Sequence, residues 1–380
     1  MNNAYIDLGG THRAQTAIET LATLKPLLKK LQITRVANVT GLDCIGIPVF
    51  IAIRPNAKHI SVSQGKGMTL ELAKASAIME SIEQWHAENI PPPAIQGAYG
   101  ALKQFYPLVD PCLIAHSIYA TDALQQWPLN WCEAIDVMTE EKILVPYEAV
   151  SLDSTNPTKA ALLFQTSTNG LASGNTLEEA MIHAFCEVIE RDAYFKWCLL
   201  SSTQKREYLV DNTTINSKLG QQLLALLSNA GINVKIWDIT SDLGVPVFQC
   251  VLADETIARS TQVFAGKGCH LDKEIALARA ITEAVQVRLT FITGSRDDVF
   301  PSYYKKPLLA NNTIISGKHD YHTIPQPEYQ HDFKKNIQQI LQLFSRKDFK
   351  QILVLNHTRE DVGIPVVHVV VPNLKMKIEA

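Results

Sequence analysis

The chain has 380 residues, of which 46% are hydrophobic and 19% charged, and its formal net charge at pH 7 is -3. This composition is typical of an ordinary folded protein and excludes a largely disordered chain. The charge balance gives no reason to expect general binding to nucleic acid or to an anionic membrane. The start of the chain lacks the basic and apolar segments of a signal peptide, and apolar stretches such as "IGIPVFIAI" are about half of the ~20 residues that a membrane span needs. The sequence therefore predicts a soluble protein of the cytoplasm.

Seven cysteines are scattered along the chain without a CxxC pair. An odd number of cysteines without this spacing argues against a disulfide framework and against a structural zinc site. We expect Cys186 and Cys198, which lie in apolar helical surroundings, to be buried and unreactive thiols.

The N-terminal segment, residues 1–34, contains an amphipathic helical pattern in "TAIETLATLKPLLKKLQI". The pattern is interrupted near Pro26, because proline cannot donate the backbone hydrogen bond that a helix interior requires. We expect this segment to pack on the remainder of the chain.

A turn followed by a strand is predicted at three places. "DCIGIPVFIAI" begins at Asp43, "DLGVPVFQCVL" at Asp242 and "DVGIPVVHVVV" at Asp361. Each sequence places a glycine turn before a run rich in β-branched residues, which is typical of a strand. "KILVPYEAV", which begins at Lys142, is a weaker relative of the same element.

A helical pattern also occurs three times, with polar or charged side chains at matched positions. The three copies are Ala73-x-x-Ser76-Ala77-x-x-Glu80-x-x-Glu83, Ala180-x-x-His183-Ala184-x-x-Glu187-x-x-Glu190 and Ala276-x-x-Arg279-Ala280-x-x-Glu283-x-x-Gln286. Thr69, Thr176 and Asp272 stand where the helix N-caps belong. The glycine-containing sequences "QGKG", "ASGN" and "AGKG" precede the helices and predict turns.

The repeats indicate how the domain is organised. A spacing near 100 residues is too long for a solenoid, so similar strand-and-helix units around one centre are the better interpretation. Two further stretches, "KLGQQLLALLSNAGINVKIWDIT" and "NIQQILQLFSRKDFKQILVLNHT", read as a helix, a turn and a strand, and residues 300–333 read as a loop. The sequence therefore predicts one α/β domain over residues 1–380, with mixed sheets covered by helices.

The spacing of the glutamates places them on shared helix faces. Residues three and four apart lie on one face, so Glu80 and Glu83 form one stripe, and Glu187 and Glu190 form another. These helices are apolar almost all round, which predicts burial, and a buried pair of carboxylates is costly without a cation. Arg191 and Arg279 are two sources of positive charge, and with them alone the pattern is a structural ion-pair network. The threefold recurrence favours a shared site for Mg²⁺ and phosphate instead.

Two smaller features leave alternatives open. Gly65-Lys66-Gly67 matches neither GxxxxGK[ST] nor GxGxxG, so it is either a tight turn or a direct phosphate contact. His183 lies one turn before Glu187, as either a core histidine or a catalytic one.

Three segments resemble the signature segments of YcaO-domain proteins. They are "SQGKGMTLELAKASAIMESIE", "NGLASGNTLEEAMIHAFCEVIERDA" and "GKGCHLDKEIALARAITEAVQVR", and the similarity extends from about Gly10 to Pro372. The resemblance implies a YcaO-type fold, ATP and Mg²⁺ as cofactors, and phosphorylation of the oxygen of a peptide-backbone amide. A side-chain nucleophile then gives an azoline, and external sulfide gives a thioamide.

The resemblance also implies roles for individual residues. Those expected to hold magnesium are Glu80, Glu83, Glu179, Glu187 and Glu190. Those expected at the nucleotide are Arg13, Ser76, Glu80, Asn175, Glu179, Arg191, Arg279 and Glu283. Those expected to act in catalysis are Glu187, Glu190, Arg191 and Arg279.

The C-terminal sequence "VVVPNLKMKIEA" differs from the proline-rich tail of azoline-forming members. It resembles members that work beside a TfuA protein in thioamide formation, although those usually have Gly where this chain has Asn373. We therefore expect deletion of Met376 to Ala380 to leave ATP turnover nearly intact. No leader-binding or helical-repeat domain is expected, so the peptide or protein substrate requires a TfuA-like partner or a separate leader-binding protein. An azoline-forming cyclodehydratase, a nucleotide-binding accessory factor and a homodimer all remain open.

Overall fold

The computed structural model describes residues 4–91, 93, 95–114, 121–155, 157–254, 263–302, 304 and 317–374. Its strands are β1 (Ile6–Asp7), β2 (His12–Arg13), β3 (Arg35–Asn38), β4 (Val49–Ile53), β5 (Val62–Lys66), β6 (Ile95–Ala98), β7 (Pro128–Asp136), β8 (Glu141–Pro146), β9 (Leu171–Ser173), β10 (Ile232–Asp238), β11 (Val247–Asp254), β12 (Val263–Cys269), β13 (Leu353–Asn356) and β14 (Val366–Val370). Its α-helices are α1 (Ala17–Leu24), α2 (Leu27–Lys30), α3 (Leu70–Glu88), α4 (Tyr99–Leu102), α5 (Thr121–Gln126), α6 (Tyr147–Val150), α7 (Leu177–Cys198), α8 (Ser202–Glu207), α9 (Lys218–Asn229), α10 (Lys273–Thr293) and α11 (Phe333–Arg346).

The predicted turn-and-strand elements form the middle strands of three similar units. These strands are β4, β11 and β14, and each pairs antiparallel with the strand that precedes a long helix: β5, β12 and β9. On its other edge each middle strand pairs with β3, β10 or β13. The prediction of recurring strand-and-helix units is therefore confirmed. Lys142 begins no further unit, because it lies in β8, which pairs with β7 in an extension of the third sheet.

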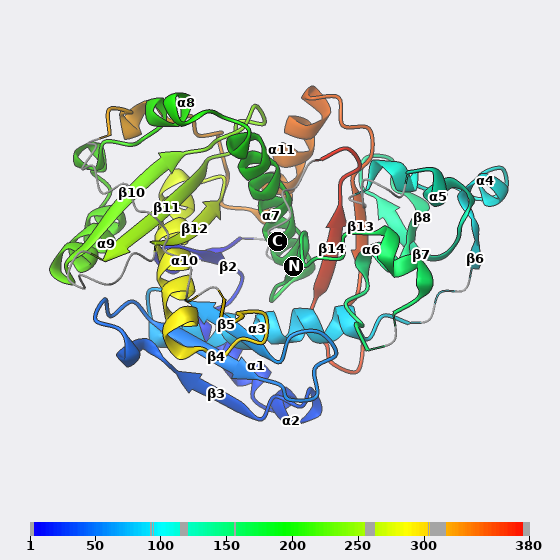
Figure 1. Ribbon diagram of the computed structural model, residues 1–380, viewed down its shortest axis with the longest axis horizontal. Coiled ribbons are helices and arrows are strands. Elements are labelled where there is room, and N and C mark those ends of the chain that lie inside the picture. Colours follow the sequence, from blue (N-terminus) through cyan, green and yellow to red (C-terminus); the bar gives the residue numbers. More distant parts are fainter. Residues whose placement is uncertain are drawn as a thin grey trace.

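The third unit is assembled from distant parts of the chain. Strand β9 and helix α7 come from the middle, whereas β13 and β14 come from residues 353–370. Figure 1 shows β14 beside α7 despite this separation. Because the parts of this unit are far apart in the sequence, consecutive sequence does not show which strands belong with α7.

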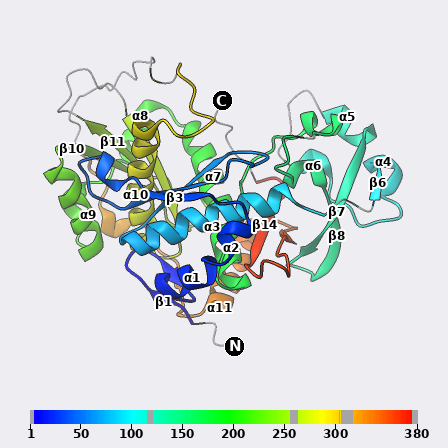
Figure 2. The same cartoon turned by 90° about the horizontal axis from the view of Figure 1, so that it is seen from below.

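The three long helices α3, α7 and α10 meet at the centre of the molecule. Each packs on its own sheet and also contacts a strand of another unit: α3 contacts β9, α7 contacts β12 and α10 contacts β5. Figure 2 shows α3 crossing the molecule below α7 and α10. The predicted N-caps are confirmed, because Thr69, Thr176 and Asp272 each accept a backbone N–H of the first helical turn.

The predicted glycine turns "QGKG" and "AGKG" are wrong, because "QGK" forms the end of strand β5, with Gly67 directly after it, and "AGKG" lies within β12. The glycines are needed there for another reason. A Cβ atom at Gly65 would lie 2.0 Å from the backbone nitrogen of Ala77, and one at Gly266 would lie 2.1 Å from that of Ala284. Glycine therefore allows each strand to approach its own helix closely enough to form the centre of the fold.

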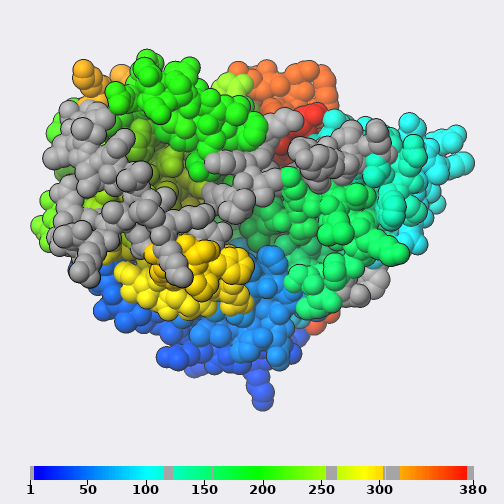
Figure 3. Space-filling model, in the orientation of Figure 1, coloured from blue at the N-terminus to red at the C-terminus, as the bar shows by residue number. Residues whose placement is uncertain are grey.

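The N-terminal segment and a side lobe complete the structure. Helices α1 and α2 are separated at Pro26 as predicted, and α1 contacts α3. This segment also forms a short antiparallel pair, β1 and β2, that the sequence did not predict. Strands β6, β7 and β8, with helices α4 to α6, form a lobe at one side of the molecule (Figure 3).

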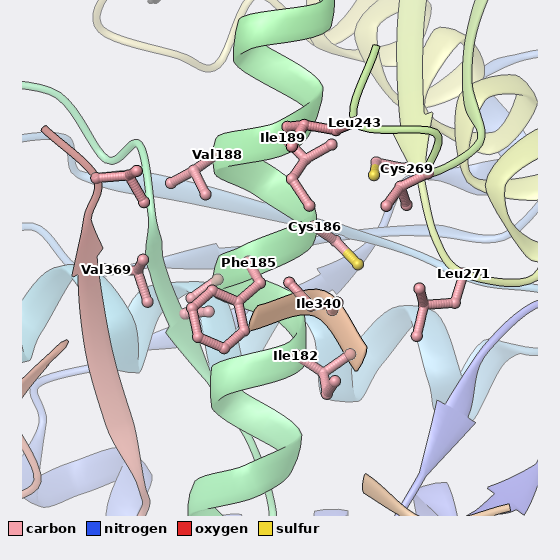
Figure 4. Packing of buried hydrophobic residues seen from close by; sticks show 14 of the residues in the cluster. Ile182, Phe185, Cys186, Val188, Ile189, Leu243, Cys269, Leu271, Ile340 and Val369 are labelled. Carbon is pink, nitrogen blue, oxygen red and sulfur yellow. The ribbon is translucent and has the colours of Figure 1, made fainter. Parts of the chain in front are cut away.

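Apolar side chains of α7 fill the core between β14, α11 and the end of β12. Figure 4 shows Phe185 and Val188 directed towards Val369, with Ile340 of α11 packed against the helix. Cys186 is buried as predicted, whereas Cys198 near the end of α7 is only partly buried. Because α7 is held on several sides, the polar side chains on its remaining face have fixed positions.

Some predictions fall on residues outside the described ranges. They concern the tail from Met376 to Ala380 and much of the loop at 300–333, of which residues 300–302, 304 and 317–333 are described. Within the described ranges, no helix is long and apolar enough to cross a membrane.

Candidate active site

A cavity of about 710 Å³ lies among α3, α7, α10 and the N-terminal segment. Every residue that the sequence assigned to a site lines this cavity. These residues are Arg13, Ser76, Glu80, Glu83, Asn175, Glu179, Glu187, Glu190, Arg191, Arg279 and Glu283. Because they come from four separate segments, the three-unit fold is what brings them together.

Glu83 is a carboxylate with hydrogen bonds but without an ion-pair partner in the part of the chain that the structure describes. Its Oε1 accepts the backbone N–H of Ser173 at 2.9 Å and the hydroxyl of Ser173 at 2.6 Å. Burial raises the pKa of Glu83 to about 8, against the effect of these hydrogen bonds, and the negative charge of Glu80 contributes to the rise. The metal-free protein therefore retains a proton here at neutral pH.

Glu187 and Glu190 of α7 also have raised pKa values. Burial raises the pKa of Glu187 to about 7, although Arg191, 3.4 Å from its Oε1, opposes the rise. Burial and the charge of Glu283 raise the pKa of Glu190, and burial raises that of Glu80. These carboxylates lie in a common cavity with less positive charge than they need, which is the setting that a divalent cation would relieve.

Glu283 on α10 is different, because two lysines neutralise it. The Lys66 ammonium lies 2.8 Å from Oε2, and the backbone N–H of Lys267 donates to Oε1 at 3.1 Å. Burial favours the neutral acid, but the charges of Lys66 and Lys267 outweigh it and lower the pKa of Glu283 to about 2. No role was predicted for Lys267, and its equivalence with Lys66 was not recognised from the sequence. The repeated Gly-Lys-Gly sequence was the signal that could have identified the pair.

The N-terminal segment supplies a basic end of the cavity. Arg13 donates from Nη1 to Glu179 at 3.3 Å and also contacts both ring nitrogens of His183. Glu179 in turn accepts the backbone N–H of Ala14 at 2.9 Å and the side-chain amide of Asn175. Glu179 and His183 lie one turn apart on α7, and Asn175 lies just before the N-cap of this helix, so the N-terminal end of α7 holds this segment in place.

These contacts bear on two of the predicted roles. The oxygens of Glu179 are directed at Arg13, Ala14 and Asn175, which favours positioning of Arg13 over direct metal binding; the magnesium assignment of Glu179 stays a prediction. Burial lowers the pKa of His183 well below its ordinary value, and the charges of Arg13 and Arg279 add to this. His183 is therefore a neutral ring at the cavity wall.

The residues present fit a nucleotide bound with Mg²⁺. Arg279 has a buried Nε atom that lacks a hydrogen-bond partner among the described residues, and Arg13 lies at the same end of the cavity. No three His, Cys, Asp or Glu side chains of the described residues are grouped closely enough to hold a metal by themselves. Mg²⁺ usually takes only one or two carboxylates from a protein and completes its shell with water and substrate phosphates, so this arrangement suits it.

Fold and cavity together define an α/β nucleotide-binding protein built from three similar units. The chain belongs to the YcaO family, because the family model for the YcaO cyclodehydratases, which bind ATP and Mg²⁺, matches residues 64–375. It is 34% identical over 96% of its length to a Rhizobium leguminosarum bv. trifolii protein from the tfuA 3′ region, of which it covers 89%.

Solved structures agree on the fold. YcaO from Methanopyrus kandleri, bound with AMPPCP and Mg²⁺, matches with a TM-score of 0.76 and 22% identity over 98% of this chain and 94% of that one. A heterocyclase in complex with substrate and cofactor matches with a TM-score of 0.77 and 22% identity over 99% of this chain. The chain spans only 54% of that heterocyclase.

Family membership confirms several predictions. The YcaO-type fold is confirmed, and ATP and Mg²⁺ are the cofactors of this family. The family model describes cyclodehydratases that bind ATP and Mg²⁺, and the reaction of this chain stays a prediction. The individual site residues stay predictions, supported by their meeting in one cavity.

Proposed function

We propose that this protein activates a peptide-backbone amide by ATP-dependent phosphorylation of its oxygen, for conversion to a thioamide with a TfuA-like partner. The observation that carries the proposal is a single cavity in which the basic Arg13 and Arg279 lie beside under-compensated carboxylates. Such a cavity suits a nucleotide bridged by magnesium to the protein. We further propose that residues 1–380 act as one catalytic domain in the cytoplasm.

The chemistry requires a better leaving group on the amide carbon. Transfer of the γ-phosphoryl group to the amide oxygen releases ADP, and the amide nitrogen loses its proton. Hydrosulfide from a separate donor then adds to the carbon, and phosphate leaves with the original oxygen. The sulfur loses its proton and the nitrogen regains one, so that the products are a thioamide, ADP and phosphate.

The roles of the residues follow from their positions. Glu83, Glu187 and Glu190 would hold Mg²⁺, and Arg13 and Arg279 would bind phosphate oxygens at the basic end. Arg191, which pairs with Glu187, lies beside the carboxylates and would offset charge that develops during phosphoryl transfer. Ser76 and Asn175 complete the nucleotide wall.

Two alternatives are distinguished by the product. The Rhizobium relative named for the tfuA region supports the thioamide. The cyclodehydratase description of the family supports an azoline, in which a Cys, Ser or Thr side chain of the substrate replaces sulfide and water is lost. An accessory role would give ATP binding without any new modification.

Mass spectrometry of cellular proteins, with and without this chain and a TfuA-like partner, tests the proposal. We expect a mass increase equal to the exchange of one oxygen for sulfur, and the increase should disappear with Glu187→Gln. Loss of one water would establish the azoline instead. Unchanged peptides beside intact Mg·ATP binding would overturn both enzymatic proposals in favour of the accessory role.

A further inference from the structure

The cavity has two chemically different ends, and the second has no assigned ligand. One end lies at Gly10, where a Cβ atom would lie 3.5 Å from both Met68 and Ala278. The other end lies where Thr290 of α10 contacts Gln64 of β5. We call this second end the amide end and define it by Gln64, Gln84, Gln286 and Thr290, which all line the cavity.

Two side-chain amides at this end each have one atom without a hydrogen-bond partner among the described residues. Gln64 and Gln84 are only 2% and 4% exposed. The Oε1 atom of Gln64 accepts the Thr290 hydroxyl, and its Nε2 has no hydrogen-bond partner. Gln84 is oriented the opposite way, since its Nε2 donates to Glu80 at 3.5 Å and its Oε1 has no partner.

Unpartnered amide atoms at these positions require an explanation. A buried polar atom without a hydrogen bond typically costs about 1–3 kcal/mol, so native proteins retain few of them. Here one atom is a donor and the other an acceptor, and both side chains belong to the wall of the same cavity. A ligand that offers one acceptor and one donor would satisfy both.

A secondary amide is such a ligand, because its carbonyl oxygen accepts and its N–H donates. Ile60, Met79 and Val287 line the same cavity and supply apolar wall for an uncharged peptide. The location suits the reaction as well. Glu80 bonds Gln84 and lies one turn from Glu83, so an amide held here would adjoin the carboxylates expected to hold Mg²⁺.

We propose that Gln64 and Gln84 form the subsite for the peptide-backbone amide that is to be modified. Gln64 donates from Nε2 to the carbonyl oxygen of this amide, and Gln84 accepts its N–H at Oε1. Rotation about the terminal side-chain bond of glutamine, which is a soft torsion, turns both atoms into the cavity. This inference rests on the proposed function for the identity of its ligand, and it deepens that function by locating the substrate.

The test compares an amide with an ester in the full-length protein. The probes are acetyl-glycyl-glycine N-methylamide and its analogue with an ester in place of the central amide. Binding is followed by saturation-transfer NMR in the presence of AMPPCP and Mg²⁺. We expect the amide to bind about tenfold more tightly than the ester, the size of one hydrogen bond to a buried group.

Two variants assign the hydrogen bonds. Gln84→Met removes the acceptor at nearly constant volume, so the preference for amide over ester should disappear. Gln64→Met removes the donor to the carbonyl oxygen, so both probes should bind more weakly while the preference remains. AMPPCP binding, measured in each variant, shows that the protein is folded.

Gln249→Met is the matched control. Gln249 on β11 also has a buried Oε1 without a partner, but it does not line the cavity. This variant should retain both probe affinities and the preference between them.

The outcomes are separable from those of the proposed function. Equal binding of amide and ester by the parent, no binding of either, or a preference that survives Gln84→Met would overturn the subsite. Loss of AMPPCP affinity with unchanged probe binding would assign the glutamines to the nucleotide base instead. Because no phosphoryl transfer is measured, failure here leaves ATP-dependent modification untouched, and amide binding without cellular modification would leave the subsite standing.

Discussion

Glu83 and Glu88 lie five residues apart on helix α3 and differ in how the protein compensates their charge. Glu88 is 2% exposed and pairs through both oxygens with the guanidinium of Arg54, with 2.7 Å between Oε1 and Nη2. It also accepts the backbone N–H of His59 at 3.2 Å. Glu83, by contrast, has only the hydrogen bonds of Ser173 within the described ranges, and burial raises its pKa to about 8.

The comparison separates a carboxylate whose charge the protein neutralises from one whose charge is left for a bound ligand to neutralise. The protein supplies the cation for Glu88 and leaves the charge of Glu83 uncompensated. Glu283 shows that the fold is able to neutralise a carboxylate in the cavity itself, since Lys66 and Lys267 do so. The incomplete compensation at Glu83 and Glu187 is therefore specific, and it points to a cation that arrives with the nucleotide.

The largest expected effect follows from removing a charge that the cation needs. Glu187→Gln keeps the shape of the side chain, and ATP turnover should fall about a thousandfold, the loss typical of a group that stabilises charge in the transition state. The metal-free variant should be at least as stable as the parent, because fewer like charges are buried. Turnover assays beside thermal melting in EDTA measure both.

Glu133→Gln is the control for this change. Glu133 is 66% exposed and pairs only with Lys142 at the surface, so its loss should alter neither quantity. A Glu187→Gln protein that melts far below the parent yet turns over ATP normally would contradict the magnesium role and make Glu187 structural.

Glu88→Gln should show the reverse pattern. The variant leaves the Arg54 guanidinium buried beside a neutral amide, which should lower the free energy of unfolding by about 3 kcal/mol. Denaturant unfolding measures the loss, and calorimetry should find the Mg·ATP affinity of the folded variant nearly unchanged. Stability equal to that of the parent, or affinity lost without a change in stability, would remove the distinction between the two carboxylates.

Local signals were sufficient for some features and not for others. The helices and their N-caps Thr69, Thr176 and Asp272 depend on neighbouring residues, so the sequence predicts them. The Arg54–Glu88 pair and the amide end depend on contacts between distant strands and helices, for which no consecutive pattern exists. The glycines of "QGKG" were misread for the same reason, because their role is set by the helix that packs against them.

The carboxylates of the site also predict how pH acts on the metal-free protein. Glu83 and Glu187 have pKa values raised from 4.5 to about 8 and about 7, so the stability they contribute is full below pH 4.5 and is lost as pH rises through 7 and 8. Compared with Glu83→Gln, the parent should lose up to about 1.4 kcal/mol per pH unit across this range. Buried histidines such as His357, whose pKa is lowered by burial, act in the opposite direction at lower pH and cancel in the comparison.

Melting in EDTA at several pH values measures this difference, and calorimetry gives its counterpart. The affinity for Mg·ATP should rise between about pH 6 and 8, because magnesium displaces protons from these carboxylates. The same stability slope in parent and Glu83→Gln would show that Glu83 is ionised without metal.

The smallest expected effect concerns His183, whose ring contacts the Arg13 side chain in the way that one structural partner holds another. Its neutral ring contacts Nη1 of the Arg13 guanidinium, and Glu179 accepts a hydrogen bond from the same nitrogen. His183→Leu removes one of the two partners, so the dissociation constant for Mg·ATP should rise about fivefold, equivalent to roughly 1 kcal/mol for one hydrogen bond. His183→Asn, which retains an acceptor close to the ring Nδ1 position, should recover most of the affinity.

A double-mutant cycle distinguishes positioning from direct contact. If His183 acts only through Arg13, then His183→Leu should have no further effect once Arg13→Ala is present. The loss of affinity caused by His183→Leu should also stay constant through pH 6.5, because the pKa of His183 lies well below this value. Additive losses in the cycle, or a loss that changes near pH 6.5, would mean that His183 meets the nucleotide itself rather than holding Arg13 in place.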